Sequence, residues 1–206
     1  MTQKSDVTED LRVRRTRKLL QQALIELTVE KGFAAVTIQD ISQRAMVNRS
    51  TVYRHYPGGK YELLEQYTNE VTAFKIDDHA TANQPEQRWQ DPPPILVNLL
   101  KHIEMFADFY RVMLGQNGDK AFTERFRKNH EERFRILMSR FGVNTATNSP
   151  PIDLSLNYLS CAMVGAIIWW LENDQPCSVE QLASWLVRLS RATMGVSPEP
   201  GGMVNT

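Results

Sequence analysis

Residues 44–60, RAMVNRSTVYRHYPGGK, place basic and aromatic side chains on one short segment beside a turn. Arginine can donate two parallel hydrogen bonds to guanine, and serine can pair with several bases. Tyrosine and histidine have polar tips on flat rings, which suits contact with phosphate and sugar at the wall of a DNA groove. The segment therefore predicts DNA binding, although an ordinary basic surface helix has the same composition.

The elements around this segment favour DNA binding. Thr37 with Asp40 three residues later is a capping-box pattern that opens one short helix, and Asn48 is a good N-cap for a second that ends near His55. A longer apolar-striped helix is expected over residues 12–31. Two short helices joined by a tight turn and supported by a longer one form a helix-turn-helix, whose second helix enters the major groove of DNA.

Charge is distributed unevenly along a chain whose formal net charge is zero. Residues 11–60 hold ten Lys or Arg and three acidic residues, a net charge of +7, so the rest of the chain carries −7. The cluster Arg12, Arg14, Arg15, Arg17 and Lys18 can add nonspecific attraction to a polyanion. A local site for a polyanion is therefore expected at the amino-terminal end.

The remaining chain shows helical periodicity and no β-hairpin signal. Helices are expected from Lys60 to the late seventies and over residues 93–114, 119–141, 153–173 and 179–194. The fold class predicted is all-α with about nine helices. Its parts are a flexible arm at 1–11, the helix-turn-helix domain at 12–60, a larger helical domain at 61–195 and a flexible tail at 196–206.

Catalytic, metal and membrane roles have little support. Cys161 and Cys177 lack the spacing of metal ligands, the histidines are scattered, and no Gly-rich phosphate loop or nucleophile elbow occurs. No enzyme, cofactor or metal is predicted. The start of the chain has no signal-peptide pattern, and the apolar run CAMVGAIIWWL is shorter than the ~18 residues of a membrane span. A cytoplasmic protein without a membrane partner is expected.

The order of residues 36–64, VTIQDISQRAMVNRSTVYRHYPGGKYELL, closely resembles the DNA-binding signature of TetR/AcrR-type transcriptional regulators. Two features depart from that signature. Met46 stands where the turn usually has Gly, and one additional residue lies between Tyr56 and Lys60. The resemblance implies that nine residues lie at or near DNA: Thr37, Gln39, Asn48, Arg49, Ser50, Thr51, Tyr53, His55 and Lys60.

The resemblance further implies that the carboxy-terminal domain dimerises and usually binds an effector. Small and large apolar residues suit a helical interface between two copies, although they could equally fill the core of one: Ala162, Gly165, Ala166, Trp169, Trp185 and Leu189. An effector pocket would draw on aromatic and Met residues that are more often plain core: Phe106, Phe109, Tyr110, Met113 and Tyr158.

The function expected is that of a homodimeric regulator, a repressor that a small-molecule effector releases from a double-stranded DNA operator. Two alternatives remain. FYRVMLGQNG and WWLENDQPCSVEQLASWL also look like segments of regulators of dihydroxyacetone kinase, in which case the effector could be a protein co-regulator. The chain could also bind DNA without any effector.

Overall fold

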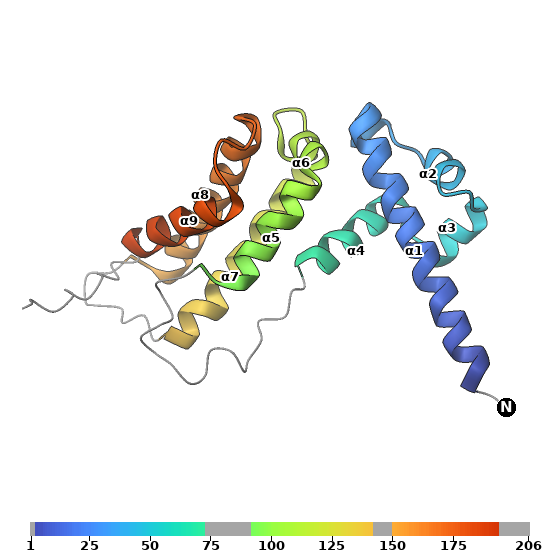
Figure 1. Cartoon of the computed structure of the whole chain (residues 1–206), viewed down its shortest axis with the longest axis horizontal. Helices are drawn as coiled ribbons and strands as arrows, with labels where there is room; N and C mark the ends of the chain where they lie inside the picture. The colour runs from blue at the N-terminus through green and yellow to red at the C-terminus, as the bar shows by residue number, and fades with distance from the viewer. Residues whose placement is uncertain (1–2, 73–91, 142–149, 194–206) are drawn as a thin grey trace, which may run out of the picture. The chain divides into compact units, whose positions relative to one another are not determined.

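The computed structural model describes residues 3–72, 92–141 and 150–193, and within these ranges every regular element is a helix, with no strand. In chain order the helices are α1 (Gln3–Lys31), the short 3-10 helix η1 (Phe33–Ala35), α2 (Ile38–Arg44), α3 (Arg49–His55), α4 (Lys60–Thr72), α5 (Pro94–Met105), α6 (Ala107–Leu114), α7 (Lys120–Phe141), α8 (Ile152–Glu172) and α9 (Val179–Thr193) (Figure 1). The all-α prediction is confirmed.

The helices group into two compact units. The first contains α1 to α4 together with α6, and the second contains α5, most of α7, α8 and α9. This division differs from the predicted boundary at residue 60, because α1 packs against α4 and α6 as well as against η1 and α2. Helices α4 and α6 therefore belong to the compact body that holds the helix-turn-helix.

The core of the first unit uses the apolar stripe predicted on its first helix. Leu20, Ala23, Leu24 and Leu27 are at most 6% exposed. Gly32 follows with φ 78°, a left-handed conformation that favours glycine and ends the helix as expected. Further along, a cluster of rings, in edge-to-face contact except for the tilted pair of Tyr110 and Phe122, joins α4, α6 and the start of α7: Tyr67, Phe109, Tyr110 and Phe122.

In the second unit, α9 packs against α5 and α8. Trp170 of α8 is fully buried, and its indole N–H donates to the carbonyl of Cys177 at 2.9 Å. The neighbouring Trp169 is 45% exposed, as expected for adjacent residues about 100° apart on a helix. The fully buried side chains of α5 include Leu100 and Ile103.

Two helix boundaries differ from those expected. Residues 3–11, expected to be an arm, lie within α1, and this stretch contains no Pro or Gly that would end a helix. The single helix expected over 93–114 breaks at Phe106, whose φ of −116° and ψ of 36° are not helical. The predicted tail and the predicted end of the helix from Lys60 lie outside the described residues.

Candidate nucleic-acid interface

The first turn of α2 is held by the predicted capping box. The Thr37 hydroxyl accepts from the Asp40 N–H at 3.2 Å, while the Asp40 carboxylate accepts from the Thr37 N–H at 2.8 Å. The ammonium of Lys31 lies 2.6 Å from the same carboxylate. Lys31 and Thr37 together hold the pKa of Asp40 well below its usual range. The start of α2 is thus fixed to the end of α1.

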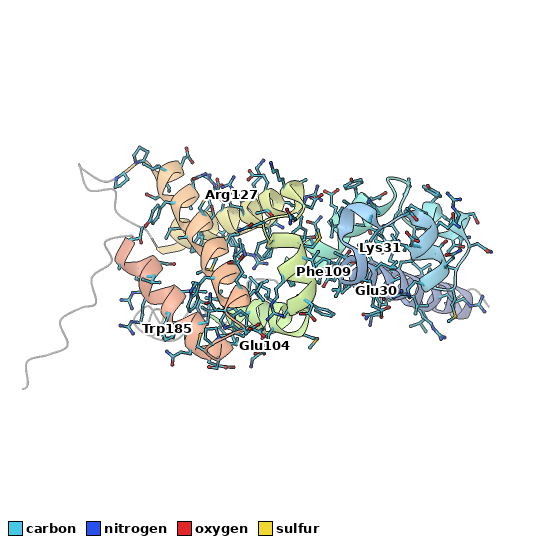
Figure 2. All side chains as sticks on the ribbon, turned by 90° about the horizontal axis from the view of Figure 1, so that it is seen from above. Glu30, Lys31, Glu104, Phe109, Arg127 and Trp185 are labelled. Atoms are coloured by element: carbon cyan, nitrogen blue, oxygen red, sulfur yellow. The ribbon has the colours of Figure 1, made fainter. Side chains whose placement is uncertain are left out.

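Arg44 provides a second connection between α2 and α1. Its guanidinium donates two hydrogen bonds of 2.7 Å to Glu30 and one of 3.0 Å to Glu26. Bidentate contacts of this kind fix geometry as well as charge. Sequence reasoning missed this pair, since the partners lie fourteen and eighteen residues apart. Figure 2 shows Glu30 and Lys31 side by side at the end of α1 that faces α2.

The turn between α2 and α3 has the unusual backbone that the sequence indicated. Met46 adopts φ 55° and is 93% exposed. A left-handed conformation disfavours a non-Gly residue by roughly 1–2 kcal/mol. Backbone hydrogen bonds offset that strain, since the N–H of Val47 donates to Ser42 and that of Met46 to Gln43. Met46 therefore replaces the usual glycine without loss of the turn.

Helix α3 exposes one face and buries the other. Val52 and Tyr56 are fully buried, whereas Arg49, Ser50 and Tyr53 are exposed. Asn48 occupies the N-cap position as expected, but its side chain forms no capping hydrogen bond. Thr37 and Gln39 are exposed at the start of α2, and Thr51 is half-buried. The outward face of α3 thus consists of groups able to contact base edges and phosphates.

A basic surface continues from α3 onto α1. Arg54 is exposed one turn after Ser50, a residue that sequence reasoning left out although its spacing from Ser50 was a usable signal. Burial lowers the pKa of His55, and the charges of Arg54 and Arg17 lower it further. Arg17 of α1 therefore lies close to the end of α3. The exposed basic residues of this stretch of α1 are Arg12, Arg14, Arg15, Arg17 and Lys18.

Lys60 is occupied within the protein. Its ammonium donates to the carbonyls of Phe33 at 2.9 Å, Ala34 at 3.1 Å and Val36 at 2.8 Å. The nitrogen also lies 4.7 Å from the centre of the Phe33 ring. An ammonium has three donors, so this arrangement leaves none for the DNA phosphate that the resemblance implied. Lys60 instead joins the start of α4 to η1.

The residues predicted for an effector pocket do not line one site within either unit. Phe109, Tyr110 and Met113 are at most 2% exposed in the core of the first unit, and Phe106 is half-buried at the break before α6. Tyr158 belongs to the second unit and is 58% exposed on α8. Most of these predicted pocket residues are therefore part of the hydrophobic core, which was the alternative interpretation of the sequence.

The residues predicted for a dimer interface are largely exposed. Trp169 is 45%, Trp185 39% and Leu189 64% exposed, while Ala162 and Gly165 are also exposed and Ala166 is half-buried. Figure 2 shows Trp185 on α9.

Helix α8 is long and apolar enough to cross a membrane by length and composition, although the apolar run seen in the sequence is shorter. Its buried side instead packs against α9, as in the core of a water-soluble unit.

No group of His, Cys, Asp and Glu able to hold a metal ion occurs within the described residues.

Comparison with known proteins covers both parts of the chain. Residues 20–67 match the family described as "Bacterial regulatory proteins, tetR family", and residues 90–192 match "Transcriptional regulator C-terminal region". A stretch of 79 residues is 38% identical to the uncharacterized HTH-type transcriptional regulator YxbF of Bacillus subtilis (strain 168), covering 38% of this chain and 20% of that protein. The chain thus matches only about a fifth of the length of this relative.

Solved structures share the fold over most of the chain. A TetR transcriptional regulator from Streptococcus agalactiae 2603V is 25% identical with a TM-score of 0.63, covering 90% of this chain and 98% of that one. The dihydroxyacetone kinase operon activator DhaS is 22% identical with a TM-score of 0.63, covering 88% of this chain and 97% of that one. With matches to both parts of the sequence, the chain belongs to the TetR family of bacterial transcriptional regulators.

Proposed function

We propose that this protein is a homodimeric, cytoplasmic transcriptional repressor that binds a palindromic DNA operator through α3. The observation that carries this proposal is the outward face of α3, which presents Arg49, Ser50 and Tyr53 while Val52 and Tyr56 anchor its other side. The capping box of α2 and the contacts of Arg44 hold this helix-turn-helix on α1. A rigid scaffold of this kind supports reading of base edges.

Arg49 and Ser50 are the residues proposed to read bases, because they lie in the first turn of α3, the part of a recognition helix that contacts base edges. Tyr53, Arg54 and His55 are proposed to contact phosphate and sugar. His55 has a lowered pKa in the free protein, and a nearby phosphate would raise it by stabilising the charged ring. The basic residues of α1 extend this attraction along the DNA backbone.

A second copy is proposed to cover the exposed apolar stripe of α8 and the adjoining face of α9. The exposed residues Leu154, Tyr158, Ala162, Gly165 and Trp169 recur every three or four positions along α8, so they share one side of the helix. A Cβ added at Gly165 would meet no atom of another described segment within 4 Å. Among the residues that the structure describes, Gly165 thus has no close neighbour beyond its own helix, which fits a place where a partner helix approaches closely.

Control by an effector is the third part of the proposal. Solved structures of similar fold hold resorcinol in one case and lauroyl-CoA in another, which supports a small molecule. A ligand loosens DNA binding only if it binds the DNA-incompetent arrangement more tightly. Because DhaS is an operon activator, an activator is the second candidate, with control by a protein partner in place of a small molecule.

Selection of bound sequences from random DNA, followed by footprinting, tests the proposal. We expect a palindrome whose half-sites are centred about 34 Å apart on one face of the duplex. Arg49→Ala should weaken binding to the selected DNA, whereas the control Lys128→Ala, at an exposed lysine of α7, should not. A promoter reporter carrying the selected site then distinguishes a repressor from an activator. Failure to enrich any sequence would contradict the proposal.

A further inference from the structure

Helix α7 carries two buried polar groups that have no partner among the described residues. His130 is 4% exposed, and its Nε2 atom forms no hydrogen bond. One terminal nitrogen of Arg133, Nη2, is likewise buried without a hydrogen-bond partner. Residues three apart lie on the same side of a helix. The two unpaired groups are therefore neighbours.

The acidic side chains near these groups form ion pairs with other basic residues. Arg127, which is labelled on α7 in Figure 2, donates a hydrogen bond of 3.3 Å to the Ser160 hydroxyl of α8. The ion pairs on this part of α7 are Arg127–Glu124 at 2.7 Å, Arg127–Glu131 at 2.9 Å, Lys128–Glu124 at 3.9 Å, Arg135–Glu131 at 3.6 Å, Arg135–Glu132 at 3.7 Å and Arg135–Asp153 at 3.2 Å. None of them includes Arg133, so its positive charge has no counter-charge within the described residues.

The surroundings of His130 favour its neutral form. Burial, with a smaller contribution from the charge of Arg133, lowers the pKa of His130 to about 3. Burial also lowers the pKa of Arg133. Phe126 packs edge-on against the His130 ring at 4.8 Å and so limits its movement. Buried polar groups without partners destabilise a fold, so each such group calls for an explanation, and a bound ligand that supplies the partner is one.

We propose that His130 and Arg133 form a binding site for an oxyanion, the carboxylate or phosphate group of a small-molecule effector. The planar guanidinium can donate two parallel hydrogen bonds to such a group, and the imidazole can donate a third. The inference rests on the proposed control by a small molecule, and it further specifies that this molecule carries a negative charge. It places the charged end of the effector on α7, in the second unit.

Generic oxyanions test the site in the full-length protein. Inorganic phosphate and benzoate are titrated by calorimetry at constant ionic strength, with benzyl alcohol as the neutral counterpart of benzoate. We expect at least one of the two anions to bind and benzyl alcohol not to bind. Arg133→Gln should weaken anion binding on the order of tenfold or more, as for loss of a charged hydrogen bond. The control Lys128→Gln removes an exposed positive charge five residues from Arg133 on the same helix and should leave affinity within about twofold.

Nuclear magnetic resonance of ¹⁵N-labelled histidine reports on His130 directly, so the buried imidazole need not be mutated. The bound anion should raise the pKa of His130, because it stabilises the charged imidazole. A preference for phosphate over benzoate would indicate a phosphate ester as effector, and the reverse preference a carboxylic acid.

Three results would overturn the inference: neither anion binds, Arg133→Gln and Lys128→Gln bind equally, or His130 titrates near 6.5 in the anion-free protein. Measuring DNA binding by the same proteins without anions separates this outcome from failure of the proposed regulatory function. A protein that binds its operator but no oxyanion would contradict only the site on α7.

Discussion

Replacing Lys60 by Met tests whether this lysine holds the protein together or binds DNA. Lys60 donates to three carbonyls around η1, and two of these hydrogen bonds are partly buried. Hydrogen bonds to charged groups contribute about 1.5–3 kcal/mol each when well shielded, and less where water competes. Allowing about 1 kcal/mol for each partly buried bond and somewhat less for the third, Lys60→Met should lower the free energy of unfolding by about 2–3 kcal/mol.

Urea unfolding measures this loss, and salt-dependent DNA binding measures the alternative. The control Lys120→Met removes an exposed lysine at the start of α7 and should change stability by less than about 0.5 kcal/mol. If Lys60 contributes no phosphate contact, the slope of log affinity against log salt should be unchanged in Lys60→Met. Unaltered stability with a slope flattened by about 0.9 per subunit would refute this reasoning and assign Lys60 to a phosphate.

Three further predictions follow from the site and the interface. Arg49→Ala should weaken operator binding by about 1–3 kcal/mol and relax the preference at one position per half-site in a repeated selection; an equal loss on random DNA would make Arg49 a phosphate contact. Gly165→Leu should give monomers in sedimentation, while Ala121→Leu, at an exposed position of α7, stays dimeric; a dimeric Gly165→Leu would place the interface elsewhere. Because the pKa of Asp40 is lowered in the folded state, its contribution to stability is present in full above about pH 4 and is lost progressively as the pH falls from there toward the lower folded-state pKa, so the advantage of the wild type over Asp40→Asn in urea unfolding should be constant above about pH 5 and shrink between about pH 4 and pH 2.5.

Local signals predicted the helix-turn-helix well. The spacing of Thr37 and Asp40 gave the capping box, the position of Gly32 gave the end of α1, and the departure at Met46 indicated a left-handed turn that the structure contains. Each of these features depends on a few adjacent residues and on backbone sterics. Periodicity likewise located α7, α8 and α9 to within about a residue at each end.

Features that depend on distant contacts were not predictable from the sequence. The break at Phe106 separates α5 and α6 into different compact units, yet the apolar pattern runs on across it. The sequence around Lys60 was consistent with two roles, because a lysine at the start of a helix can contact a phosphate or the three carbonyls that lie twenty-four to twenty-seven residues away. Burial of His130 also depends on packing that a helical pattern does not specify.

The central claim is that the outward face of α3 reads base sequence, in addition to attracting the DNA backbone. The most direct measurement compares dissociation constants on the selected DNA and on a scrambled duplex at one salt concentration. We expect the wild type to prefer the selected DNA by about a thousandfold or more. Replacing Arg49, Ser50 and Tyr53 together by Ala should reduce that preference to near one while most of the weak binding to scrambled DNA remains. A wild-type preference near one, or a preference unchanged in the triple variant, would contradict the claim.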